Sequence, residues 1–265
     1  MSLVVAVLLG WSLMAIVMAG LWWHQKRRGD PGIVDVAWGL GVGAIGGLFC
    51  LLASQGDRTR RGVLALLVVA WSIRLSSHIA ARLKKLPGDG RYQTLREQWG
   101  VAAQAKFFGF FQLQAFWSML FALPILVAAT NPRPFPQVTD LAAIGLWILA
   151  VCGEAIADRQ LQQFRIDPAN RGQVCRRGLW YYSRHPNYFF EWLHWWSYPL
   201  FAVGAPWWGL AVFGPLAMYW FLTRVTGIPP TEAQAIRSRG DAYREYQSST
   251  SPFFPWFPRS EQAVR

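Results

Sequence analysis

The chain has 265 residues, a hydrophobic fraction of 53%, a mean hydropathy of +0.20 and a formal net charge of +12. This much apolar surface exceeds what one soluble core can bury, so an ordinary soluble domain is excluded. The charge alone would be compatible with nucleic acid, but the basic residues lie between apolar blocks and none of the known nucleic-acid modules surrounds them. We therefore expect no nucleic-acid partner.

The apolar blocks have the length of membrane-crossing helices, since about 20 helical residues cross roughly 30 Å of hydrocarbon. The predicted fold is therefore all-α: a polytopic membrane protein with a seven-transmembrane-helix bundle, formed as one integral membrane domain over 1–265. The predicted helices lie near 2–23, 31–53, 62–83, 105–129, 138–162, 187–203 and 206–226. The connectors 84–104 and 163–186 and the tail 227–265 are polar enough to lie at the membrane interface.

Lysine and arginine predict the orientation of the bundle. With the N-terminus outside and the C-terminus inside, 21 of the 26 basic residues lie at cytoplasmic connectors and 4 lie at the opposite ones. This asymmetry follows the positive-inside rule. We therefore expect an integral protein of the inner (plasma) membrane whose polar connectors face the cytoplasm.

The second predicted helix carries a glycine face and a carboxylate. Gly39, Gly43 and Gly47 recur every four residues, which indicates close packing against another helix. Asp35 lies four residues into the span, where an ionisable group is costly unless it faces a cavity or a partner. It is either an interfacial residue at the helix start or a buried acid that could donate a hydrogen bond to a substrate carbonyl.

A polar stripe follows on the third predicted helix. Arg74, His78 and Arg82 are spaced one turn apart and share a helix face. A lone arginine near a helix end can simply extend its charge to the interface. Three in register, followed by Asp89, Arg91 and Tyr92, favour the wall of a polar cavity that opens to the cytoplasm.

The densest polar stretch joins the fifth and sixth predicted helices. Glu154, Asp158 and Arg165 lie near one face of the fifth helix, and Asn187 and Glu191 share a face of the sixth. Arginines suit phosphates, while carboxylates and amides suit ribose hydroxyls and a nicotinamide carboxamide. The mixture favours a dinucleotide site, and the alternative is a structural polar network that ties a loop to two helices.

Metal and disulfide chemistry receive no support from the sequence. Glu191 and His194 form one E-x-x-H motif, but a di-iron bundle needs that motif twice, and no second copy is present. The three cysteines form no C-x-x-C pair, and their odd number argues against a disulfide framework.

Longer motifs resemble a known family. They are Asp158-x-Gln160-Leu161, Gly178-Leu179-Trp180-x-Tyr182-Ser183-Arg184-His185-Pro186-Asn187-Tyr188-x-x-Glu191, Gly227-Ile228-Pro229 and Tyr243-x-x-Tyr246. Their order resembles the steroid 5-alpha-reductase superfamily, especially its uncharacterised bacterial branch. Weaker similarity extends to Asp35-x-x-Trp38-Gly39 and to the segment from Arg91 to Gly100, so it covers most of the chain.

The resemblance implies a bacterial membrane oxidoreductase that uses NADPH to saturate the C=C bond of an α,β-unsaturated carbonyl in a steroid-like or other lipid substrate. The cofactor would enter from the cytoplasm. The predicted cofactor contacts are Asp158, Arg165, Arg184, His185, Asn187, Tyr188, Glu191 and Arg224. The predicted catalytic residues are Asp35, Trp71 and Arg74, where Trp71 stands in place of a tyrosine on the third helix of the eukaryotic enzymes. Phe190 stands where the bacterial pattern commonly has glycine.

Two other classes remain open. Isoprenylcysteine and phospholipid methyltransferases, which use S-adenosylmethionine, carry a similar R-H-P-x-Y block followed by a glutamate-bearing segment, here near Glu232. The motif Asp158-x-Gln160-Leu161 and the polar face of the fifth helix favour the reductase. A transporter or lipid-binding protein would explain a bundle with a cavity, but it would leave the polar groups gathered at one end unexplained.

Overall fold

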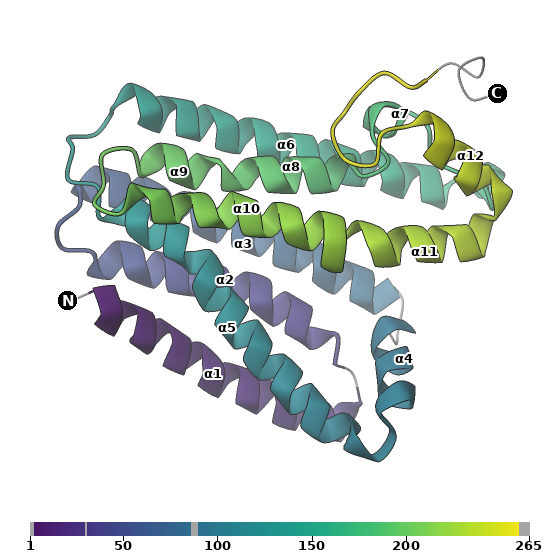
Figure 1. The fold of residues 1–265 in the computed structure, drawn as a ribbon, viewed down its shortest axis with the longest axis horizontal. Helices are drawn as coiled ribbons and strands as arrows, with labels where there is room; N and C mark the ends of the chain where they lie inside the picture. The colour runs from purple at the N-terminus through teal and green to yellow at the C-terminus, as the bar shows by residue number, and fades with distance from the viewer. Residues whose placement is uncertain (1–2, 30, 86–89, 260–265) are drawn as a thin grey trace. The chain divides into compact units, whose positions relative to one another are not determined.

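The computed structural model describes residues 3–29, 31–85 and 90–259, and all regular structure within these ranges is helical (Figure 1). The chain forms two compact units. Unit 1 contains Met1–Asp140 and Phe201–Ala211, and unit 2 contains Leu141–Leu200 and Val212–Arg265. The predicted all-helical class is confirmed.

Unit 1 is a bundle built around the second helix. Its elements are α1 (Leu3–Arg28), α2 (Ile33–Leu52), α3 (Arg58–Lys85), α4 (Gly90–Trp99), η1 (Gly100–Ala102) and α5 (Ala103–Ala129). Helix α2 packs against α1, α3 and α5, and α4 packs against α5. The core between them is apolar and aromatic, with Met18, Phe49 and Phe107 fully buried.

Glycine permits the close approach of α2 and α3. A Cβ on Gly39 would lie 2.6 Å from Ser76 Oγ, and a Cβ on Gly43 would lie 2.3 Å from Ser72 Oγ. Ser72 Oγ also donates a hydrogen bond to the carbonyl oxygen of Gly39 at 2.8 Å. The predicted packing face is confirmed at these two glycines, whereas a Cβ on Gly47 would make only an ordinary contact at 3.7 Å.

Unit 2 begins within the long helix α6 (Val138–Ile166) and continues through short elements. These are η2 (Pro168–Asn170), α7 (Leu179–Tyr182), α8 (Pro186–Trp195), α9 (Ser197–Phe201), α10 (Phe213–Trp220), the π-helical η4 (Phe221–Val225), α11 (Ile228–Arg239) and α12 (Asp241–Ser249). Helices α6, α8 and α10 run side by side (Figure 1). The 3-10 element η3 (Trp208–Val212) precedes α10.

Within the described ranges, five helices are long and apolar enough to cross a membrane: α1, α2, α3, the helix ending at Ala129, and α6. The chain is therefore a membrane protein by length and composition. The predicted spans 187–203 and 206–226 are instead divided into shorter segments. Pro199 and Pro215 have no backbone N–H, so neither can donate the hydrogen bond that would continue a helix. Ser197 Oγ also donates to the carbonyl oxygen of His194 at 2.7 Å and so competes with the helical hydrogen bond to that oxygen.

Candidate functional site

The polar end of unit 2 is built on a loop that lies against α6. Gly178 adopts a φ of +59°, and a Cβ there would lie 2.5 Å from the Gln160 side chain. Gln160 Oε1 accepts a hydrogen bond from the Leu179 backbone N–H at 2.9 Å. Trp180 Nε1 donates to the carbonyl oxygen of Ala157 at 2.9 Å. The motifs Asp158-x-Gln160-Leu161 and Gly178-Leu179-Trp180 therefore form one structural unit.

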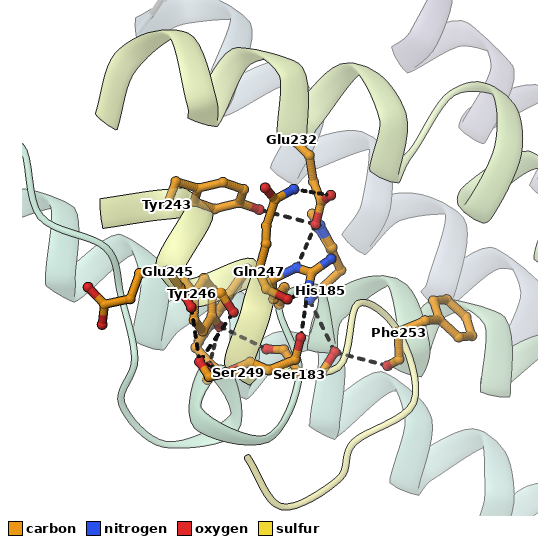
Figure 2. Close-up of polar contacts among 12 residues, drawn as sticks. Ser183, His185, Glu232, Tyr243, Glu245, Tyr246, Gln247, Ser249 and Phe253 are labelled. Carbon is orange, nitrogen blue, oxygen red and sulfur yellow. Dashed lines mark hydrogen bonds and ion pairs between the residues drawn. The ribbon is translucent and has the colours of Figure 1, made fainter. Parts of the chain in front are cut away.

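Glu232 of α11 joins the residues that follow this loop (Figure 2). Its Oε1 accepts hydrogen bonds from Arg184 Nε at 2.7 Å and His185 Nε2 at 3.2 Å. Its Oε2 accepts one from Gln247 Nε2 at 2.7 Å, and Tyr243 OH donates to Oε1 at 3.4 Å. One carboxylate thus binds side chains from the loop and from α12.

Arg184 also holds the end of α12. Its Nη1 donates to the carbonyl oxygens of Gln247 at 2.9 Å and Thr250 at 2.5 Å. Its charge, its Nε and its Nη1 are therefore engaged by the protein. The predicted role of Arg184 as a cofactor contact stays a prediction, while its contacts give it a clear positioning role.

The network sets the protonation of its members. Burial raises the pKa of Glu232, but hydrogen bonds from His185, Arg184 and Gln247 and the charge of Arg184 together lower it to about 2. Burial lowers the pKa of His185 more than Glu232 raises it, so His185 is neutral at pH 7 and donates its Nε2 proton. Burial and the charge of Glu232 raise the pKa of Tyr243.

The polar faces of α6 and α8 meet as expected. Asn187 Nδ2 donates to Asp158 Oδ1 at 3.2 Å. Asn187 Oδ1 is buried, and no donor within the described residues reaches it. The predicted convergence is confirmed at this pair, while its role in cofactor binding stays a prediction.

Two neighbours on α8 are held in different ways. The Tyr188 ring stacks on His185 with centroids 5.2 Å apart and an interplanar angle of 4°. Its hydroxyl lies 3.1 Å from Thr231 Oγ1. Glu191 is buried and accepts a hydrogen bond from Trp195 Nε1 at 3.0 Å. Both side chains are therefore fixed in place rather than extended into solvent.

The remaining predicted cofactor residues differ in exposure. Along α6, Glu154 is buried, Asp158 is half-buried and Arg165 is exposed, so the polar face opens toward the end of the helix. Arg224 is also exposed, and it belongs to the π-helical segment η4, a type of local irregularity that is frequent at functional sites. Arg165 and Arg224 are therefore accessible to an anionic ligand.

Phe190 has a complementary glycine on α6. A Cβ on Gly153 would lie 2.5 Å from the Phe190 ring, so the ring occupies the space beside that glycine. The bulky residue is half-buried in this contact. The departure of Phe190 from the bacterial pattern is thus accommodated by packing against α6.

In unit 1, the Tyr92 hydroxyl of α4 donates to Asp35 Oδ1 at 2.9 Å. Asp35 lies in the first turn of α2, as expected for an interfacial residue at the helix start. It is also half-buried, as expected in part for a buried acid. Trp71 is fully buried, and its ring meets Trp38 edge-on at 6.4 Å. The phenol beside the acid therefore comes from α4, a pairing that the sequence comparison with third-helix tyrosines missed.

The predicted polar stripe is only partly enclosed. Arg74 is half-buried, whereas His78 and Arg82 are exposed. Asp89 lies outside the described residues, as does the Arg91 side chain. The proposed cavity wall on α3 stays a prediction.

Glu232 entered the sequence analysis only through the methyltransferase alternative. The sequence did contain a helical pattern in the segment that binds Glu232. Tyr243, Tyr246, Gln247 and Thr250 have the i, i+3, i+4, i+7 spacing of one helix face, and the first three lie in α12. Tyr243 and Gln247 of this face reach Glu232. Tyr246 OH donates to the carbonyl oxygens of Trp180 and Ser183, which fixes α12 to the loop before α8.

Comparison with known proteins gives the family and leaves the activity open. No curated protein and no solved structure matches the chain. The family described as "Protein of unknown function (DUF1295)" has a model that matches residues 21–250, which is most of the sequence. The chain therefore belongs to the DUF1295 family.

Proposed function

We propose that this protein is a membrane-embedded, NADPH-dependent reductase that saturates the C=C bond of an α,β-unsaturated carbonyl in a lipid-like substrate. The observation that carries the proposal is the buried Asn187 Oδ1, for which the described residues supply no donor. Such an atom costs free energy unless a ligand or an ordered water pairs with it.

The orientation of the Asn187 amide indicates the kind of ligand. The Asp158 carboxylate accepts a hydrogen bond from Nδ2, which leaves the amide oxygen to face a donor. The carboxamide of nicotinamide carries an N–H₂ group of this type. Asp158 can also accept from a ribose hydroxyl, and the exposed Arg165 and Arg224 suit the phosphates.

Arg184 and His185 hold the segment that leads into the same site. Their contacts with Glu232 fix the backbone that leads into Pro186 and Asn187 at the start of α8. A rigid approach of this kind holds the Asn187 amide in one orientation, which lowers the cost of ordering it on binding.

Asp35 and Tyr92 are the groups that we assign to the substrate carbonyl. When bound, NADPH supplies a hydride to the β carbon of the enone. The Asp35 carboxyl, in its protonated form, would then donate a hydrogen bond to the developing enolate oxygen. The Tyr92 hydroxyl, which donates to Asp35 Oδ1, would hold that carboxyl in place. A proton from water at the α carbon would complete the saturation.

We also propose a membrane topology for the chain. Seven crossings, with the N-terminus outside, would leave the Arg184 network on the cytoplasmic side, where NADPH is found. The five long apolar helices support a membrane location, and the distribution of basic residues supports the orientation.

The test is NADPH binding to the detergent-purified protein, with Asn187→Ala compared with Gln163→Ala. Both changes remove an amide, but Gln163 is exposed on α6. We expect Asn187→Ala to weaken NADPH binding by about tenfold, the value of one hydrogen bond, and Gln163→Ala to leave it unchanged. Equal affinities for all three proteins would contradict the assignment of Asn187.

A methyltransferase that uses S-adenosylmethionine is the second candidate. It is favoured by one observation, the contact of Glu232 with Arg184 and His185, which joins the R-H-P block to a glutamate-bearing segment. The same binding measurement separates the two candidates. Binding of S-adenosylmethionine without NADPH would replace the reductase by the methyltransferase.

A further inference from the structure

The C-terminal segment Ser251–Arg259, here called the aromatic arm, is fixed to the loop before α8. It contains four aromatic residues and three prolines, and it lies beyond the residues that match the family. Three hydrogen bonds join it to Tyr182, Ser183 and Arg184: Arg184 N to Ser251 O, Ser183 Oγ to Phe253 O, and Trp256 N to Tyr182 O, each 2.9 Å long. A fourth, from Arg259 N to Ser249 O at 2.9 Å, ties its far end to α12. The arm is therefore an ordered part of unit 2.

The arm lies along the flank of α8 and α10. The Phe254 ring meets Trp192 of α8 edge-on, with centroids 5.6 Å apart, and it lies 6.2 Å from Tyr219 of α10. Phe253 is buried against the same two rings, at 5.7 Å and 5.4 Å. The arm thus covers side chains of two helices rather than extending away from them.

This flank adjoins the candidate membrane-crossing helix of unit 2, α6. Helix α8 packs on α6 through Phe190 and Gly153, and Gly153 lies inside the candidate span Val138–Ile166. The neighbouring helix α10 exposes Leu216 and Trp220. In a chain with several membrane-crossing helices, an exposed apolar face of this kind is expected to face lipid.

The outer face of the arm is strongly aromatic. Phe254 is 48% exposed, and Trp256 and Phe257 are each 73% exposed. The Phe257 ring meets exposed Tyr182 at 5.6 Å, which makes the surface continuous. Contact of this surface with water would be unfavourable, because transfer of apolar area out of water is favourable.

We propose that the aromatic arm docks on the bilayer, with Trp256 and Phe257 at the boundary between headgroups and acyl chains. Tryptophan favours this depth, because its ring system is largely apolar and also carries a hydrogen-bond donor. The apolar ring of phenylalanine is removed from water at the same depth. Exposed Arg259 at the end of the arm complements anionic headgroups. We assign the lipid surface, rather than a second protein, as the partner of the arm, because the arm continues the apolar flank of α8 and α10.

Docking has a consequence for the polar network. The arm bonds directly to the backbone or side chain of Ser183 and Arg184. Attachment to the bilayer therefore restrains the two residues that precede His185. This inference depends on the membrane location of unit 2 and is independent of the proposed reductase activity.

The experiment places a nitroxide label at Trp256→Cys in nanodiscs of phosphatidylethanolamine and phosphatidylglycerol. Exposed Cys152 is first replaced by alanine, while Cys50 and Cys175 are buried. Leu216→Cys on α10 provides a lipid reference, and Asp241→Cys on α12 provides a water reference. Collision of the label with oxygen, which concentrates in lipid, is compared with collision with a water-soluble nickel chelate.

We expect the ratio of oxygen to nickel collisions at Trp256 to exceed the ratio at Asp241 severalfold and to approach that at Leu216. A ratio equal to that at Asp241 would place the arm in water and overturn the proposal. Low collision rates with both reagents would indicate a protein cover, such as a second copy, and would overturn it as well. Phe257→Cys gives the same decision if Trp256→Cys does not fold.

Discussion

Two arginine-centred networks, one in each unit, use similar chemistry in different surroundings. In unit 1, Arg60 binds both carboxylate oxygens of Asp140 at 2.7 Å, and both side chains are 0% exposed. In unit 2, Arg184 makes one bond to Glu232, and the two side chains are 9% and 13% exposed. Each arginine also donates to two backbone carbonyl oxygens.

The partners of the carboxylates explain the difference. Asp140 receives the fork of Arg60 and the backbone N–H of Gln137 at 2.8 Å, a set of donors that holds one geometry. Glu232 is shared by an arginine, a neutral histidine, an amide and a phenol. The first network fastens a connector to α3, whereas the second includes a histidine, which titrates near pH 6.5 when it is exposed in the unfolded chain.

The largest expected effect is at the enclosed pair. Arg60→Ala leaves the Asp140 charge buried without its main partner, which should lower the free energy of unfolding by about 3–5 kcal/mol. Thermal unfolding in detergent measures the loss. Arg58→Ala, which removes an exposed arginine two residues away, should change little.

The double variant Arg60→Met, Asp140→Leu sharpens this test. Apolar residues of similar volume remove both buried charges, so most of the lost stability should return. If Arg60→Ala alone is as stable as the native chain, the pair does not fasten the connector and the contrast between the two networks fails.

The second expected effect is smaller, because water reaches the Glu232 network. Glu232→Gln keeps the shape of the side chain but removes the charge that Arg184 faces, and should cost about 1–2 kcal/mol. Thermal unfolding again measures the change. The control is Glu245→Gln, because Glu245 pairs with Arg176 on the surface of unit 2 with side-chain exposures of 64% and 39%.

Glu245→Gln should change the stability by less than about 1 kcal/mol, as for other surface pairs. Equal losses at positions 232 and 245 would mean that Glu232 holds Arg184 no more firmly than a surface contact does.

The long helices could be predicted because their signal is local. The apolar blocks gave α1, α2, α3, α5 and α6 with ends within several residues of those observed. Hydropathy averages over Pro199 and Pro215, so it merged short segments into two further spans. It also gave no sign of α4, whose ten residues are mainly polar.

The candidate site could be predicted only where contacts follow helix faces. Asp158 and Asn187 were expected to converge because each lies on a polar face, and their side chains do meet. The pairs Arg60–Asp140 and Arg184–Glu232 join residues 80 and 48 positions apart. Such pairing depends on tertiary packing, so an isolated arginine in a connector indicates only membrane orientation.

The smallest expected effect is a dependence of stability on pH that arises in the second network. The pKa of His185 is lowered below its usual 6.5 in the folded chain. As pH falls through 6.5, the unfolded chain therefore binds a proton that the folded chain does not, and stability declines by at most about 1.4 kcal/mol per pH unit. Glu232 adds a separate loss between its usual 4.5 and about 2, because its carboxylate is favoured by folding.

His185→Gln separates these two contributions. Glutamine can still donate to Glu232, but it does not titrate, so the decline between pH 6.5 and 4.5 should become smaller while the decline below pH 4.5 remains. Thermal unfolding across this range measures both slopes. Identical pH profiles for the variant and the native chain would show that protonation of His185 is not linked to folding, and would contradict the contribution assigned to it.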